Sequence, residues 1–88
     1  PVIVGELGNF LSNYEDSENL FVAWQEVNDA LRQAAQTLPA AGFVSSEGLE
    51  DKGDSVHFNA VALREFGRRY ACEYSAVAQR EGIELENR

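Results

Sequence analysis

The densest group of reactive side chains in this sequence lies in the segment DKGDSVHFN, residues 51–59. It contains the single histidine of the chain, His57, with the carboxylate of Asp54 three positions before it. An aspartate that accepts the Nδ1 proton of a histidine fixes its tautomer and leaves Nε2 free to take a proton from a nucleophile. The spacing predicts an acid–base dyad of Asp54 and His57. The alternative is a hydrogen bond at a helix start that serves structure alone.

Two neighbours of this pair suggest other chemistry. Ser55 would place a hydroxyl beside the dyad, but three nearly consecutive residues in one short loop rarely fold into a triad, so we expect Ser55 to be an ordinary loop hydroxyl. A metal site of His57 with Asp51 or Asp54 would have one imidazole and scattered carboxylates. This is weak support for a metal. We therefore predict neither a metal nor another cofactor.

Composition limits the partners. The 88 residues are enough for one small domain, and the apolar share of 44% and charged share of 25% are those of a globular protein. Fifteen acidic and seven basic residues give a net charge of −8, which repels phosphate backbones and anionic membranes. We expect no nucleic-acid or membrane partner. Neutral substrates such as sugars are compatible with this charge, although it does not select them.

Other sequence features say little about the compartment. The sequence has no apolar run long enough to span a membrane and no signal peptide, so the localisation stays open. Cys72 is the single cysteine and forms no internal disulfide; we expect a small buried thiol on a helix.

The elements that must position the reactive segment begin with an apolar, β-branched strand over residues 1–7, expected to be buried on both faces as in a parallel sheet. A helical period follows over residues 19–38, with Ser17 or Asp16 as its N-cap and Pro39 after its end. Its apolar stripe comprises Leu20, Trp24, Val27, Leu31, Ala34 and Leu38.

The second half repeats this order. A weaker strand is predicted over residues 41–45, then a loop over 46–58 and a helix over 60–80, with Asn59 as N-cap and Gly82 at the C-terminal end. The apolar stripe of this helix comprises Leu63, Phe66, Tyr70, Tyr74 and Val77. We predict one domain over residues 1–82 and an acidic tail over 83–88.

This order predicts an α/β fold with one right-handed β-α-β unit and a closing helix. Ligands of open α/β sheets bind beyond the carboxyl ends of the strands, where Asp54 and His57 would lie. Glu6, Asn9 and Asn13 follow the first strand and are further candidates to line a site, with ordinary loop polarity as the alternative.

Three more side chains have two interpretations each. Trp24 is a possible sugar platform, but its place on the apolar stripe favours core packing. Arg68 and Arg69 are candidates for substrate contact, but on a helix they are more often solvated or paired with Glu65 or Glu73.

Three segments in this order resemble a known family: PVIVGELGNF (1–10), GLEDKGDSVHFN (48–59) and REFGRRYA (64–71). They are similar to the C-terminal part of the sialate O-acetylesterase and acetylxylan-esterase group of the SGNH-hydrolase superfamily. The resemblance implies a flavodoxin-like three-layer fold and removal of acetyl groups from carbohydrates through an acyl-serine. It implies that Asp54 is the triad acid and His57 the general base.

The same resemblance implies that the nucleophile and the oxyanion-hole glycine and asparagine lie on upstream segments that this sequence lacks. The chain would correspond to the last two β-α units of a longer fold and would be inactive alone. A different class of function is a non-catalytic oligomeric module derived from that fold. Because no inner strand covers residues 1–7, we expect a homo-oligomer, a dimer through this edge and the first helix.

Overall fold

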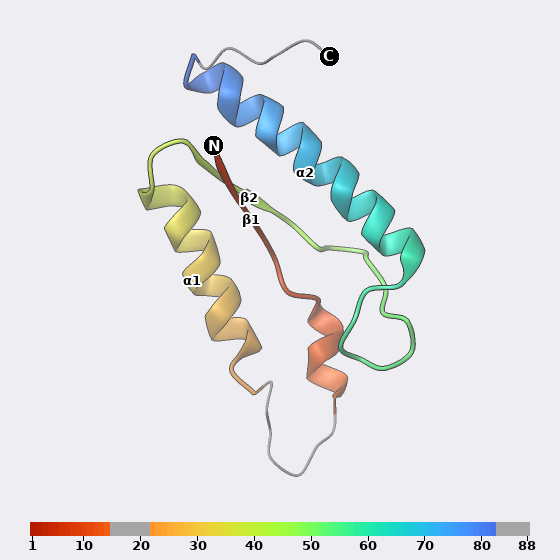
Figure 1. Cartoon of the computed structure of the whole chain (residues 1–88). Coiled ribbons are helices and arrows are strands. Elements are labelled where there is room, and N and C mark those ends of the chain that lie inside the picture. Colours follow the sequence, from red (N-terminus) through yellow and green to blue (C-terminus); the bar gives the residue numbers. More distant parts are fainter. Residues whose placement is uncertain (15–21, 83–88) are drawn as a thin grey trace.

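The computed structural model describes residues 1–14 and 22–82, and Figure 1 shows how its elements are arranged. In chain order these elements are β1 (Val2–Gly5), the 3-10 helix η1 (Asn9–Asn13), α1 (Trp24–Thr37), β2 (Ala41–Val44) and α2 (Ala60–Arg80). The predicted order of strand, helix, strand and helix is confirmed. None of the described helices is long and apolar enough to cross a membrane.

The two strands are parallel, with Val2 opposite Ala41 and Gly5 opposite Val44. The amide of Val2 donates to the carbonyl of Ala40 at 2.8 Å and that of Glu6 to the carbonyl of Val44 at 2.9 Å. Figure 1 shows the strands between α1 and α2, so that the sheet is the middle of three layers. The carboxyl ends of both strands consequently lie at one edge, as the β-α-β order predicts.

The core lies between the sheet and α2. It is formed by Val44, Leu49, Ala62 and Phe66, with Ile3, Phe58 and Tyr70 packed against it. Phe58 and Phe66 meet edge to face with 5.0 Å between ring centroids. α2 approaches the sheet closely because Gly5 has no side chain: a Cβ there would collide with the hydroxyl of Tyr70. This contact explains the glycine at the end of an otherwise β-branched strand.

The predicted caps of α2 are confirmed. The Oδ1 atom of Asn59 accepts the amide of Ala62 at 2.7 Å, which satisfies one of the free N–H groups at the helix start. Gly82 follows Glu81, the last cap residue of the helix, with a left-handed φ of 70° that a residue with a Cβ rarely adopts. These signals are local, and the predicted bounds of 60–80 agree with the structure.

The start of α1 differs from the prediction. The helix begins at Trp24, and Val22 and Ala23 form a turn before it. The proposed caps Ser17 and Asp16 lie outside the described residues, as does the predicted tail over 83–88. Both described residues of the predicted helix before Trp24 lie in the turn, so the prediction starts the helix too early.

Several burial predictions were wrong. Val2 is 51% exposed rather than buried on both faces, because one partner strand and one helix on each side cover β1 incompletely. On α2, Leu63 and Tyr74 are exposed although they belong to the apolar stripe. Cys72 is also exposed, because its side of the helix carries Arg68 rather than a packing partner; the nearest guanidinium nitrogen lies 3.7 Å from Sγ.

One buried polar side chain holds α1 to the end of β1. Asn28 is 5% exposed; its Oδ1 accepts the amide of Leu7 at 2.7 Å and its Nδ2 donates to the carbonyl of the same residue at 3.1 Å. The side chain therefore substitutes for a neighbouring strand just where β1 stops pairing. Buried backbone groups without such partners are costly.

We expect Asn28→Ala to lower the free energy of unfolding by about 1–3 kcal/mol, because it leaves the amide of Leu7 without its partner. Urea unfolding followed by circular dichroism measures this change. Gln25→Ala, on an exposed position of the same helix, is the control and should change the free energy by less than about 0.5 kcal/mol. Equal unfolding midpoints for the two variants would contradict this role of Asn28.

Candidate active site

The segment that carries Asp54 and His57 is a closed loop between β2 and α2. Its two sides are joined by hydrogen bonds from the amide of Lys52 to the carbonyl of His57 at 2.9 Å and from the amide of Asn59 to the carbonyl of Glu50 at 3.0 Å. An isolated antiparallel bridge joins Asp51 and Phe58. The loop thus presents its tip, residues 53–56, from a base fixed at the start of α2.

The two side chains meet at this tip. Nδ1 of His57 lies 2.6 Å from Oδ2 of Asp54. The other carboxylate oxygen, Oδ1, accepts the backbone amides of Val56 at 3.0 Å and of His57 at 2.9 Å. The aspartate is held by the backbone and in turn orients the imidazole. The catalytic and the structural interpretations both contain this hydrogen bond, so the catalytic role stays a prediction.

These hydrogen bonds favour the charged carboxylate. The backbone amide of His57 makes the largest contribution, followed by its side chain and the amide of Val56, and together they hold the pKa of Asp54 well below its ordinary value. The ammonium of Lys52 lies 3.9 Å from Oδ2, at the margin of an ion pair. Asp54 is therefore ionised at neutral pH, and its carboxylate accepts hydrogen bonds and donates none.

A second aspartate shapes the same tip. Oδ2 of Asp51 accepts the amides of Gly53 at 3.2 Å and of Ser55 at 2.7 Å. Both of those residues have positive φ, 109° for Gly53 and 60° for Ser55. The sequence suggests Asp51 only as a candidate metal ligand, and its role in holding the tip of the loop becomes evident in the structure. Its position two residues before a glycine was the available signal, since Asp side chains often bond to backbone amides two residues on.

The imidazole is open on its other side. The side chain of His57 is 67% exposed, and no hydrogen bond from the described residues reaches Nε2. Ser55, two residues before the histidine, makes no hydrogen bond to the imidazole; its amide is held by Asp51. The geometry offers a proton acceptor without a hydroxyl placed against it in the described ranges.

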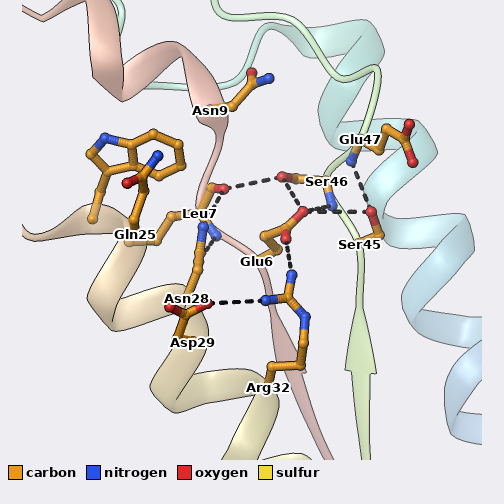
Figure 2. A pocket seen from close by; sticks show the side chains of 11 residues that line it. Glu6, Leu7, Asn9, Gln25, Asn28, Asp29, Arg32, Ser45, Ser46 and Glu47 are labelled. Carbon is orange, nitrogen blue, oxygen red and sulfur yellow. Dashed lines mark hydrogen bonds and ion pairs between the residues drawn. The ribbon is translucent and has the colours of Figure 1, made fainter.

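A hollow of about 530 Å³ lies at the carboxyl ends of the two strands, on the α1 side (Figure 2). Glu6 lies at its centre: one carboxylate oxygen accepts from Arg32 at 2.6 Å, and the other accepts from the amide and hydroxyl of Ser46 at 2.9 and 3.0 Å. Glu6 and Asn9 line the hollow and Asn13 is not among its lining residues. Trp24 is half-buried and also borders it, so that it is not a fully packed core residue.

The histidine and the hollow are separate features. His57 does not line the hollow, and η1 connects the two regions: Asn9 borders the hollow, whereas Phe10 packs against Phe58 with 5.1 Å between ring centroids. Ser46 and Arg32, which complete the polar network, were not predicted as site residues. They come from different elements, and the sequence gives no signal that Glu6 joins them.

The arginine pair of α2 fastens the loop to the helix. The carboxylate of Glu65 accepts hydrogen bonds from Arg68 at 2.7 Å and from Arg69 at 2.8 Å. These two guanidinium groups lower the pKa of the carboxyl group to about 2, and Arg68 contributes more than Arg69. Arg69 also donates to the carbonyls of Ser45 and Glu47 at 2.9 Å each. The predicted pairing with Glu65 is confirmed. In the part of the chain that the structure describes, no group of three or more His, Cys, Asp or Glu side chains is arranged to hold a metal ion.

The low pKa of Asp54 predicts a pH-dependent stability. Since its pKa is lower in the folded than in the unfolded state, its contribution is present above the ordinary value of 3.8 and is lost as the pH falls below it. We expect Asp54→Asn to melt at a lower temperature than the wild type at pH 6, and the difference to narrow below pH 4. Thermal unfolding across this range tests it; a difference of constant size, as for the non-titrating Gln25→Ala, would contradict it.

A comparison with models of known protein families places the chain in one of them. The family model described as carbohydrate esterase, sialic acid-specific acetylesterase, matches residues 1–76, which include both strands, the loop and most of α2. A comparison with curated protein sequences finds no match. This match confirms the family resemblance of the sequence over more than four-fifths of the 88-residue chain. The chain belongs to the carbohydrate esterase family of sialic acid-specific acetylesterases.

Proposed function

We propose that this chain carries the acid–base pair of a serine-type O-acetylesterase that acts on acetylated carbohydrates. In this proposal Asp54 orients the imidazole of His57, and His57 transfers the proton. The observation that carries the proposal is the 2.6 Å contact between Nδ1 and Oδ2, on an imidazole that remains largely exposed. Family membership supports the proposed reaction class, and the contact supports the proposed roles of the two residues.

The chemistry follows from the tautomer. With its proton on Nδ1, the imidazole accepts the proton of a serine hydroxyl at Nε2 while the serine oxygen attacks the acetyl carbon. The imidazolium, stabilised by Asp54, then protonates the departing sugar oxygen, which leaves an acetyl-serine. Water repeats the sequence: it gives one proton to Nε2, attacks the acetyl carbon and releases acetate as the serine recovers its proton.

We further propose that the serine comes from polypeptide outside this chain, so that the 88 residues do not hydrolyse esters by themselves. The support is that Ser55 is engaged through its amide with Asp51 and makes no hydrogen bond to the imidazole. In hydrolysis of p-nitrophenyl acetate, we expect the chain and His57→Ala to give the same rate. A rate that falls in His57→Ala but not in Ser55→Ala would instead locate a nucleophile elsewhere within these residues.

The function itself is tested by transplantation. Residues 1–76 replace the corresponding segment of a working sialic acid-specific acetylesterase, and release of acetate from an O-acetylated sugar is measured. We expect an active chimera in which His57→Ala lowers kcat by about 10²–10⁴-fold, the usual contribution of a general base. Asp54→Asn should lower kcat without a matching change in KM, because the aspartate orients the imidazole rather than the substrate.

Ser55→Ala is the matched control in the same loop and should leave the rate of the chimera unchanged. An active chimera that tolerates His57→Ala would show that the pair serves structure alone. A nitrogen-15 NMR spectrum of the isolated chain separates geometry from function. The neutral imidazole should carry its proton on Nδ1 in the wild type and lose this preference in Asp54→Asn.

A further inference from the structure

The tip of the loop between β2 and α2 is held by side chains of the loop itself. The carboxylates of Asp51 and Asp54 accept its amides. In the described part of the chain, the amides of Gly53, Ser55 and Val56 donate to these two carboxylates and to no other group. A Cβ built on Gly53 would have no atom within 4 Å. The hydrogen bonding of the tip therefore depends on two aspartates and not on a neighbouring element.

Ser55 lies between the bonds of the two aspartates. Its amide donates to Oδ2 of Asp51 at 2.7 Å, which is shorter than the amide bonds to Asp54 at 3.0 and 2.9 Å. The φ angle of Ser55 is 60°, a left-handed conformation that is disfavoured for a residue with a Cβ. Such a conformation persists only where the surroundings hold it. The short bond to the Asp51 carboxylate provides that hold.

The geometry of the dyad follows from the turn at Ser55. Directly after this residue, the amides of Val56 and His57 face Oδ1 of Asp54. The other oxygen of the same carboxylate meets Nδ1 of His57 at 2.6 Å. The contact between Asp54 and His57 thus depends on a backbone conformation that Ser55 does not favour by itself. These bonds use the amide of Ser55 and not its hydroxyl, so Ser55→Ala retains them.

We propose that Asp51 is a positioning residue for the proton transfer. It holds Ser55 in the left-handed conformation and thereby gives Asp54 and His57 the geometry in which they meet. In the described residues Asp51 makes no hydrogen bond to the imidazole, so it acts through the backbone. The inference rests on the proposed function of the pair. It adds that the pair is oriented within this chain, before a serine from other polypeptide joins it.

Nitrogen-15 NMR of the isolated chain tests the positioning directly. We expect Asp51→Ala to lose the preference of the neutral imidazole for a proton on Nδ1, as Asp54→Asn does. Asp51→Asn should keep this preference, because its amide oxygen still accepts backbone amides. Glu50→Ala is the matched control: it removes one negative charge from the neighbouring, exposed position and should also keep the preference. The fold should persist in all three variants, because backbone bonds close the base of the loop.

Carbon-13 NMR titration of the Asp54 carboxyl group separates positioning from charge. The backbone amide and side chain of His57 and the amide of Val56 hold its pKa well below the ordinary value of 3.8. The ammonium of Lys52 is the other charged group beside it, at 3.9 Å. Loss of a neighbouring negative charge alone would lower this pKa further. Loss of the positioning bond should instead raise it, so we expect a rise in Asp51→Ala and none in Glu50→Ala.

The chimera with a working acetylesterase gives the kinetic readout. Asp51→Ala should lower kcat by about 10–100-fold with little change in KM, because it misplaces the proton acceptor and not the substrate. Glu50→Ala should change neither constant.

Two results would overturn the inference about Asp51 alone. One is an Asp51→Ala chain that keeps both the tautomer and the low pKa of Asp54. The other is a chimera that needs His57 but tolerates Asp51→Ala. A chimera that tolerates His57→Ala as well would overturn the proposed function, and with it the part of Asp51 in the reaction. In that case the NMR changes in Asp51→Ala would show a structural role only.

Discussion

The parallel pairing of β1 with β2 is the constraint on which the rest of this molecule depends. Parallel strands need a crossover between them, and α1 is that crossover, so its position over one face of the sheet follows from the pairing. The pairing also brings both carboxyl ends to one edge. There the backbone of Leu7 ends its strand against the side chains of Asn28 and Ser46 instead of against another strand.

Where the pairing of β1 with β2 ends, polar side chains supply the hydrogen bonds that join the neighbouring segments. Glu6 joins β1 to α1 through Arg32 and to the loop after β2 through Ser46, so one carboxylate connects three segments. On the other side of η1, the aromatic contacts of Phe58 with Phe10 and Phe66 anchor the loop that holds His57. The proton transfer that we propose for His57 needs a rigid support, and these aromatic contacts provide one for its loop.

A small α/β unit with two strands has little capacity to bury its own surface. In this chain some of the apolar surface stays exposed. Two arginines of α2 donate hydrogen bonds to the outer edge of β2, and the core side chains of the helix pack on Gly5 and Val44. The side of α2 that faces away from these arginines carries exposed apolar residues. The exposed Leu63 and Tyr74 are therefore not errors of a helical pattern. They belong to the apolar stripe of α2, and the described residues leave them 57% and 42% exposed.

The sequence by itself determined what depends on near neighbours. The order of elements, the bounds of α2 with its caps Asn59 and Gly82, the approach of Asp54 to His57 and the family all followed from periodicity, capping and motif, because these interactions span a few residues. Only the tertiary structure decided what depends on distant partners: the exposure of Cys72 and Leu63, the burial of Asn28, and the joining of Glu6 to Arg32 and Ser46. Such contacts link segments 20 to 40 residues apart, and no local pattern records which of several polar side chains a strand end will meet.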